Sequence, residues 1–369
     1  MREGAAAFAA RISRQRLDPA VLAWAETAAR GRWGVALSGG ADSVALLVLL
    51  RELWPERRKD LVALHFDHRL RGRASRADAA FCRRLCAALG VRFVGEAWTG
   101  STAGASEAEA REARMIFFRK HASVVWLGHQ RDDVAETMLM RLARGSGAGG
   151  LAAPRPVQRF ADGRVHLRPL LALRHAEITA ALRAAGVPWR EDATNATDAH
   201  LRNRVRRDVL PRWERAAGRD AAAGAARSRE LLEEDDSALE AWVEALRSVD
   251  ARGRLVLSRL RGRPRAIWRR ALHRWVLANP AAATLSRVAF DALLADLEKG
   301  KRTRHSVGRS HFAVCDGRFL ALRPAAAPIG AKRAACGAHQ LTYPSGTSTV
   351  PKESSPQCLN PKKRNRVAS

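Results

Sequence analysis

The chain has 369 residues, of which 47% are hydrophobic and 28% charged, so most of it can fold and two domains are expected. Lys and Arg number 65 against 37 Asp and Glu, and this net charge of +28 predicts a polyanionic partner, with nucleic acid first. No apolar run is long enough to span a membrane, and five irregularly spaced cysteines do not form a secreted disulfide framework, so we expect a cytoplasmic protein without a membrane partner.

Strand-like and helix-like patterns alternate over the first 144 residues. An amphipathic helix is expected at 18–30, and buried strands at 33–37, 60–68, 91–98 and 123–129. Helices are expected at 43–53, 75–90, 106–122 and 131–144. This alternation predicts an α/β fold, a Rossmann-like parallel sheet with helices on both faces. Ligands of such sheets bind beyond the carboxyl ends of the strands.

The second half of the chain has a different pattern. A Gly/Pro-rich loop covers 143–156 and a helix is expected at 172–186. Helices and then short strands follow, with a hairpin turn at Asp316-Gly317. We therefore expect four segments: a helical lead-in (1–30), a nucleotide-binding domain (31–215), a smaller, mostly helical or α+β domain that binds the substrate (216–324), and a basic, disordered tail (325–369).

The stretch "SGGADS" (38–43) lies between the first strand and its helix. It lacks the spacing of a dinucleotide-binding loop and the lysine of a Walker loop. Gly39 and Gly40 permit a tight turn close to an anion, and the hydroxyls of Ser38 and Ser43 can donate to it. A carboxylate beside phosphate suggests Mg²⁺ between them, so Asp42 is the candidate metal ligand. The alternative is that Asp42 or Ser43 only caps the helix.

The whole string resembles the pyrophosphatase loop of the N-type ATP pyrophosphatases, the PP-loop superfamily. The resemblance implies that ATP is cleaved between its α- and β-phosphates, that a carbonyl or carboxyl oxygen is adenylated, and that the loop holds the leaving pyrophosphate. The residues that it assigns to the nucleotide are Ser38, Gly39, Gly40, Ala41, Asp42 and Ser43.

Four further stretches narrow the resemblance: 65–82, 109–118, 128–151 and 190–211. They look like the tRNA(Ile)-lysidine synthetases, and the likeness is close from Trp33 to Pro211. "REDATNATDAHLRNRVRRDVLP" is the most specific of them. The resemblance implies that ATP adenylates the 2-oxo group of the wobble cytidine in an isoleucine tRNA with anticodon CAU. The ε-amine of free L-lysine then displaces AMP. Oligomeric state is left open, a homodimer included.

Acidic residues follow the fourth strand. His129, Asp133 and Glu136 have the spacing i, i+4, i+7 and are expected on one helix face, with Asp132 adjacent. Free lysine has a side-chain pKa near 10.4, so a carboxylate or histidine must bind its ammonium group and accept a proton. The alternative is that these acids only stabilise a helix N-terminus.

Basic residues are expected around the phosphates and the RNA. Arg111 and Arg114, three residues apart, are candidates for stabilising charge during adenylation, and ion pairs with Glu107 and Glu112 are the alternative. Residues expected to contact tRNA are Arg144, Arg202, Asn203, Arg204, Arg206 and Arg207. Residues expected at the adenosine end of ATP are His65, Asp67 and His68, although His65 fits equally well as a buried histidine with one hydrogen bond.

Two other functions remain open. A PP-loop enzyme that makes 2-thiopyrimidine in tRNA would use paired cysteines, and the only close pair is Cys82 and Cys86. An RNA-binding protein with an inactive nucleotide fold is disfavoured by the intact glycine turn. A zinc deaminase has little support, because neither C-x-x-C nor H-E-x-x-H occurs.

Overall fold

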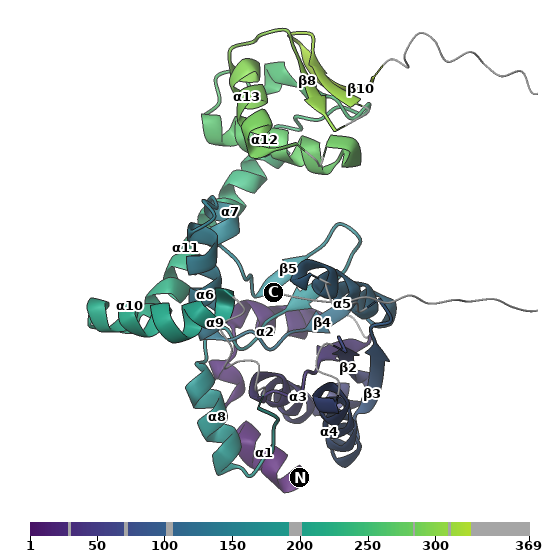
Figure 1. Cartoon of the computed structure of the whole chain (residues 1–369), viewed down its shortest axis with the longest axis vertical. Helices are drawn as coiled ribbons and strands as arrows, with labels where there is room; N and C mark the ends of the chain where they lie inside the picture. Colours follow the sequence, from purple (N-terminus) through teal and green to yellow (C-terminus); the bar gives the residue numbers. More distant parts are fainter. Residues whose placement is uncertain are drawn as a thin grey trace, which may run out of the picture.

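The computed structural model describes residues 1–28, 31–69, 73–100, 106–191, 201–282, 285–308 and 311–325. Nine residues of the most specific family stretch, "DATNATDAH" (192–200), and all but the first residue of the expected tail lie outside the described residues. In Figure 1, a larger unit around one sheet is joined by a long helix to a smaller unit with a second sheet.

The larger unit contains a six-stranded sheet of order β3-β2-β1-β4-β6-β5. Its strands are β1 (Trp33–Ala36), β2 (Leu61–Asp67), β3 (Arg92–Ala97), β4 (Val124–Trp126), β5 (Val157–Arg159) and β6 (Val165–Leu167). All neighbours pair in parallel except β5, which pairs antiparallel with β6. The predicted parallel sheet is confirmed. The β5–β6 hairpin was not predicted, because two strands of three residues are too short to show a period.

Helices surround this sheet, and all but α1 and α7 correspond to helices that the sequence predicts. They are α1 (Arg2–Arg11), α2 (Pro19–Thr27), α3 (Ala41–Leu53), α4 (Arg73–Leu89), α5 (Glu107–His121), α6 (Arg131–Leu142), α7 (Ala148–Leu151) and α8 (His175–Ala184), with 3₁₀ turns at Arg14–Arg16 and Pro55–Asp60. On one face, α1, α3, α4 and α8 share a core that includes Trp33 and Trp126. On the other face, Phe117 and Phe118 of α5 pack against Val125. Helices therefore cover both faces, as predicted.

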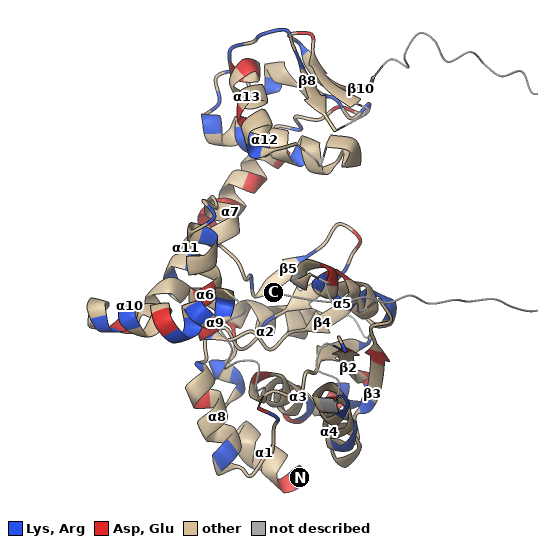
Figure 2. Cartoon of the chain, in the orientation of Figure 1, with Lys and Arg blue, Asp and Glu red and all other residues tan. Residues whose placement is uncertain are grey.

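A continuous helical stretch leads out of this unit. It comprises α9 (Leu201–Arg204), a π-helical turn (Val205–Val209) and α10 (Leu210–Ala217), and is followed by the 25-residue α11 (Ala221–Ala245). The Asp220 side chain caps α11 by accepting from the backbone of Ala223. One end of α11 packs on α6 and α7 and the other on α12, so this single helix connects the two units. Figure 2 shows Lys and Arg gathered on α9 where it crosses α6.

The smaller unit has an antiparallel sheet of order β7-β10-β9-β8. Its elements are β7 (Leu255–Val256), a 3₁₀ turn (Leu257–Arg259), α12 (Arg265–Leu277), a 3₁₀ turn (Pro280–Ala282), α13 (Arg287–Glu298), β8 (Thr303–Val307), β9 (His311–Cys315) and β10 (Phe319–Pro324). The predicted turn at Asp316-Gly317 joins β9 to β10. Asp316 accepts from the backbone of Arg318 and Phe319, and Gly317 has a φ of +87°. A smaller α+β domain is therefore confirmed.

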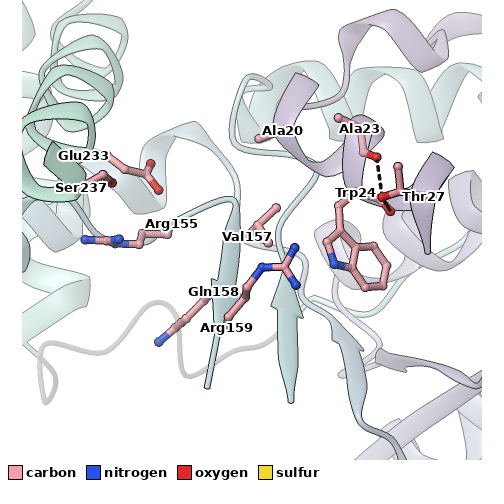
Figure 3. A pocket seen from close by; sticks show the side chains of 10 residues that line it. All are labelled: Ala20, Ala23, Trp24, Thr27, Arg155, Val157, Gln158, Arg159, Glu233 and Ser237. Carbon is pink, nitrogen blue, oxygen red and sulfur yellow. Dashed lines mark hydrogen bonds between the residues drawn. The ribbon is translucent and has the colours of Figure 1, made fainter. Parts of the chain in front are cut away.

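The surface of the larger unit carries a groove. A groove of about 910 Å³ lies between α2, β5 and α11, and Trp24, Arg155, Arg159 and Glu233 are among the side chains that line it (Figure 3). Among the helices described, none is both long and apolar enough to cross a membrane.

Candidate functional site

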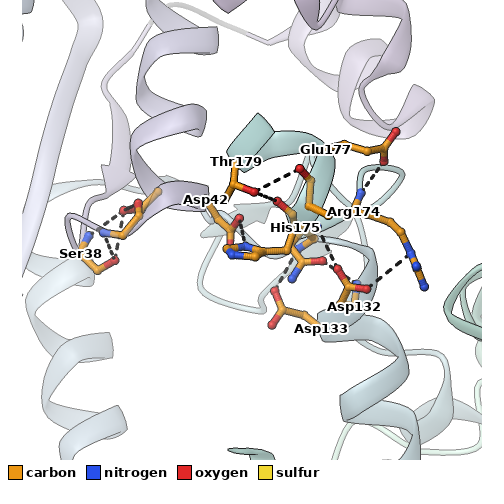
Figure 4. Close-up of polar contacts among 12 residues, drawn as sticks. Ser38, Asp42, Asp132, Asp133, Arg174, His175, Glu177 and Thr179 are labelled. Carbon is orange, nitrogen blue, oxygen red and sulfur yellow. Dashed lines mark hydrogen bonds and ion pairs between the residues drawn. The ribbon is translucent and has the colours of Figure 1, made fainter. Parts of the chain in front are cut away.

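The turn between β1 and α3 closes around the hydroxyl of Ser43. Ser43 Oγ accepts from the backbone N–H groups of Ser38 and Gly39, both at 3.2 Å, and donates to the carbonyl of Gly40 at 2.8 Å. Figure 4 shows the hydrogen bonds of this turn beside the labelled Ser38. The N-cap residue of α3 is Gly40, which offers no side-chain cap, so neither Asp42 nor Ser43 acts as one. The first amides of α3 therefore have no side-chain acceptor, which is the arrangement that binds anions.

The two glycines of this turn differ in their physical role. Gly39 has a φ of +96°, which side chains rarely adopt, and a Cβ there would lie 3.2 Å from Cys82 Sγ. Gly40 has an ordinary φ of −70°, and a Cβ there would meet only Ser38 Oγ, at 3.5 Å. The backbone thus requires glycine at Gly39, whereas neither the backbone nor the protein contacts require it at Gly40. Open space in front of Gly40 is consistent with room for a ligand.

The ends of β1 and β4 meet at the turn. A Cβ on Gly128, just beyond β4, would lie 3.0 Å from the backbone oxygen of Asp42. The sequence predicted that polar segments after separate strands meet at one edge of the sheet, and this contact confirms it for the segments after β1 and β4.

Asp42 has a partner that the sequence did not reveal. The Nδ1 atom of His175 donates to Asp42 Oδ1 at 2.9 Å, and the backbone N–H of His175 donates to Asp132 Oδ2, also at 2.9 Å (Figure 4). Burial raises the pKa of Asp42, and the hydrogen bond to Asp42 raises the pKa of His175. For Asp42, burial therefore outweighs the attraction of the imidazole. The only sequence signal was a histidine at the start of an amphipathic helix.

His129 does not lie on the acidic helix. The helix α6 begins at Arg131, with Gln130 as its N-cap, so the prediction that His129 shares a helix face with Asp133 and Glu136 is wrong. The glutamine side chain accepts from the backbone of Asp132 and ends the extended segment there. Burial lowers the pKa of His129 to about 3, so its ring is neutral at physiological pH.

Asp133 has the capping role that the sequence left open as the alternative. Its Oδ2 accepts from the backbone N–H of Gln130 at 2.9 Å. Its other oxygen, Oδ1, faces Arg206 at 3.5 Å and Arg202 at 3.8 Å. One carboxylate thus both caps α6 and takes part in an ion-pair cluster.

Glu136 is the centre of that cluster. Its side chain is fully buried, and its two oxygens accept from Arg202 Nε at 2.9 Å and Arg206 Nε at 2.5 Å. Burial raises the pKa of Glu136, and both arginines oppose that shift. Arg202 and Arg206 were expected to contact tRNA phosphate, but in this structure they neutralise acids of α6. Both side chains remain partly exposed, at 40% for Arg202 and 43% for Arg206.

Of the other arginines expected at the RNA, Arg144 and Arg204 are exposed. Arg207 is also exposed and pairs with Asp208 at 3.3 Å. Asn203, between Arg202 and Arg204 on α9, is half-buried. These positions lie on α9, the π-helical turn and the segment after α6, all beside the acids of α6.

The residues expected at adenosine lie at the end of β2. The buried His65 donates from Nδ1 to the carbonyl of Leu37 at 2.8 Å, which is the contact expected of a packed histidine. Asp67 accepts from the backbone of Arg69 at 2.7 Å. The His68 ring packs edge-on against Phe66 and Trp98. The His65 contact reaches the segment that follows β1, whereas the contacts of Asp67 and His68 are with residues at the ends of β2 and β3.

Arg111 and Arg114 lie on α5. No described carboxylate pairs with Arg111, so the expected alternative of an ion pair with Glu112 is not formed. Arg111 is close enough to Arg168 to lower its pKa, and Arg114 has the same effect on His129. Both arginines are therefore near the carboxyl ends of β6 and β4.

Cys82 and Cys86 are packed inside the protein. Both side chains are 0% exposed, and burial raises the pKa of each thiol to about 12. Sulfur chemistry requires a thiolate, and these two cysteines remain protonated. The pair that carried the thiolation alternative is thus part of the core.

Comparison with known proteins identifies the family. The model of the PP-loop domain matches residues 13–213, more than half of the chain. A tRNA(Ile)-lysidine synthase of Solibacter usitatus is 48% identical over 190 residues, which cover 50% of this chain and 41% of the relative. One from Thermobifida fusca is 40% identical over 269 residues, covering 69% of this chain and 80% of the relative. The U34-tRNA thiolase NcsA from Methanococcus maripaludis with its [4Fe-4S] cluster, a solved structure, is 18% identical with a TM-score of 0.48, covering 61% of this chain and 78% of that one.

The chain spans about half the length of most of the curated relatives that it matches. The matched region contains the whole six-stranded sheet, the glycine turn, and the acids of α6 with their arginine partners. From its PP-loop domain and from these relatives, the chain belongs to the tRNA(Ile)-lysidine synthase family of PP-loop proteins.

Proposed function

We propose that this protein ligates free L-lysine to the 2-position of the wobble cytidine in an isoleucine tRNA with anticodon CAU. ATP first adenylates the cytidine oxygen and pyrophosphate leaves; the ε-amine of lysine then forms the carbon–nitrogen bond and AMP leaves. The observation that carries the proposal is the junction of β1 and β4, where an anion-binding turn lies against a cluster of buried acids. Phosphate activation and an amine nucleophile require these two features together.

The turn from Ser38 to Ser43 is the proposed site of the ATP phosphates. The uncapped amides at the start of α3 would hold the pyrophosphate, with Gly40 leaving space for it. His65, Asp67 and His68 would flank the adenosine. Arg111 and Arg114 are proposed to stabilise charge during adenylation.

A magnesium ion fits this turn through one protein ligand, Asp42. No group of three His, Cys, Asp or Glu side chains that could hold a metal occurs within the described ranges. Mg²⁺ at nucleotide sites is usually bound by one or two carboxylates together with substrate phosphates, so a single carboxylate beside open amides is sufficient. The bound ion would neutralise charge on the phosphates.

The acids of α6 are the proposed lysine site. A lysine ammonium must lose a proton before it attacks, and Glu136 is the better acceptor because burial raises its pKa, whereas His129 is a weak base. Asp133 offers its Oδ1 atom beside Glu136 for the ammonium group. Arg202 and Arg206 favour the ionised form of Glu136 and oppose the effect of burial on its pKa.

The exposed arginines beside α6 are the proposed tRNA contacts. Arg144, Arg204 and Arg207 are exposed at the surface beside the Glu136 cluster and are not members of it. Asn203 is proposed to orient a base or a loop. The net charge of +28 supports a polyanionic substrate of this size.

The test is direct. The full chain is incubated with total bacterial tRNA, ATP and isotope-labelled lysine, and the nucleosides are separated and identified by mass. We expect lysidine, formed with one AMP per lysine and only when ATP is present. Sulfur incorporation without lysine, or RNA binding without ATP turnover, would contradict the proposal.

A further inference from the structure

Arg168 is a buried cation that has no acidic partner among the residues that the structure describes. It follows β6 directly and is only 5% exposed. Its Nη1 donates to the carbonyl of Arg155 at 2.8 Å and its Nη2 to the side-chain oxygen of Gln158 at 3.0 Å. Its Nε is buried without a hydrogen-bond partner. Both partners are neutral, so the charge is not compensated.

The other buried arginines of the described chain each form an ion pair with a carboxylate. Arg57 pairs with Asp60, and Arg229, which is 3% exposed, pairs with Glu233. Burying a cation without a counter-charge costs free energy, and that cost normally requires compensation. Arg168 therefore differs from the arginines that serve only to hold helices together.

More positive charge lies beside Arg168. Burial, together with the positive charges of the neighbouring Arg111 and Arg141, lowers its pKa to about 10. Arg141, from α6, is half-buried and donates to the carbonyl of Gly150. No carboxylate in the described ranges pairs with Arg111, Arg141 or Arg168. Three neighbouring guanidinium groups without a carboxylate partner form a positive site that can bind an anion.

The neighbouring His166 supports this interpretation. It is 3% exposed, and its Nε2 has no hydrogen-bond partner. It precedes Arg168 by two residues on β6 and therefore shares its face of the sheet, opposite Gln158 on β5. At this end of the hairpin, two buried nitrogen atoms, His166 Nε2 and Arg168 Nε, make no hydrogen bond to the described residues.

The place of the cluster in the sheet indicates which substrate it serves. In the order β2-β1-β4-β6, the proposed adenosine end lies beyond β2 and Arg168 lies on the opposite side of the glycine turn, two strands away. Between them, His129 at the end of β4 interacts electrostatically with both Asp133 and Arg168. The cluster thus adjoins the lysine site on the side away from adenosine.

We propose that Arg168 and Arg141, beside Arg111, bind a backbone phosphate of the RNA substrate. The phosphate would compensate the buried charge and fix the reacting nucleotide next to the acids of α6. Arginine binds phosphate through a fork of N–H groups, and the buried Nε of Arg168 makes no hydrogen bond to the described residues. This assignment rests on the proposed function, which supplies the RNA.

The experiment compares Arg168→Gln and Arg141→Gln in the full chain. Binding of an RNA stem-loop with the anticodon CAU is measured by fluorescence anisotropy from 50 to 300 mM salt, roughly the range over which counterion release is resolved. We expect each variant to bind this RNA about ten-fold more weakly. The salt slope should also fall by ~0.7 to ~0.9, the value for one phosphate contact. ATP affinity, measured by calorimetry, should be unchanged.

The matched control is Arg119→Gln, an exposed arginine near the opposite end of α5 from Arg111, which should leave the RNA affinity and slope unchanged. Circular dichroism checks that each variant is folded, and the half-buried Arg141 gives a test if Arg168→Gln does not fold. Unchanged RNA affinity and slope in Arg141→Gln overturn the proposal. Loss of ATP affinity with RNA binding retained also overturns it, because the phosphate is then that of ATP.

Wild-type lysine incorporation separates this inference from the function on which it rests. If the wild type incorporates lysine and the variants keep the full salt slope, the phosphate site is wrong and the function stands. If the variants lose slope but the wild type incorporates no lysine, the phosphate site stands and the function is wrong.

Discussion

Asp42, in the turn after the first strand, is hydrogen-bonded to His175, which lies 133 residues further along the chain at the start of α8. The same histidine donates its backbone N–H to Asp132 at the start of α6. His175 therefore joins the glycine turn to the acidic helix through one side chain and one main-chain group. This linkage holds the proposed ATP site and lysine site in a fixed relationship.

Replacing Asp42 with Asn keeps the shape of the side chain and removes its charge. Because an amide is a poor ligand for Mg²⁺, we expect ATP–pyrophosphate exchange to fall at least about a hundred-fold, a size typical for loss of a key electrostatic group. The affinity for tRNA should change less than about two-fold, since phosphate contacts elsewhere supply it. Exchange assays and anisotropy measure the two quantities. Near-normal exchange in Asp42→Asn would disprove the metal role.

The two glycines of the turn give a matched pair. Gly39→Ala forces a left-handed φ on alanine and should lower the free energy of unfolding by about 1–2 kcal/mol. Gly40→Ala has an ordinary φ and should leave stability almost unchanged, but its methyl group enters the proposed pyrophosphate space and should weaken ATP binding by about ten-fold or more. Urea unfolding and calorimetry measure the two effects. Normal ATP affinity in Gly40→Ala would count against the location of the phosphate.

Glu136→Gln leaves Arg202 and Arg206 beside a neutral side chain. Removing one partner of a buried ion pair can cost about 3–5 kcal/mol, but these arginines are 40% and 43% exposed and can turn toward water, so we expect a loss of about 2 kcal/mol. Lysine incorporation should also be lost. Asp208→Asn, which breaks the exposed pair with Arg207, is the control and should cost less than about 0.5 kcal/mol. Equal stability losses in both variants would refute a central role for Glu136.

His166 predicts a pH dependence of stability. Its pKa is about 4 in the folded protein, because burial disfavours the charged ring, against about 6.5 in the unfolded chain. Between these values the unfolded chain binds more protons. The folded state therefore loses stability as the pH falls from 7, by about 2 kcal/mol at pH 5 from this group. His166→Gln should remove the part of this pH-dependent loss of stability that comes from His166. His273→Gln, at an exposed position on α12, should leave the loss unchanged. Urea unfolding at pH 7 and pH 5 gives the comparison, and an unchanged pH slope in His166→Gln would exclude this origin.

Local chemistry in the sequence determined the sheet and its phosphate turn. Buried strands alternating with amphipathic helices leave few arrangements other than a parallel sheet. The glycine turn at 38–43 is the proposed anion site because glycine lets the backbone turn tightly and come close to a ligand. The hairpin at Asp316-Gly317 was also readable, because a left-handed residue is required there.

Only the tertiary structure decided which charges meet. Nothing in the sequence pairs Asp42 with His175, or Glu136 with Arg202 and Arg206, because their separations follow no helical or strand period. Arg202 and Arg206, expected at the RNA, pair with buried acids in the structure. Arg168, which follows a strand too short to predict, is buried with neutral hydrogen-bond partners and with no acidic partner among the described residues. Periodicity reports which face of an element is buried, whereas burial of charge depends on segments brought together by the completed fold.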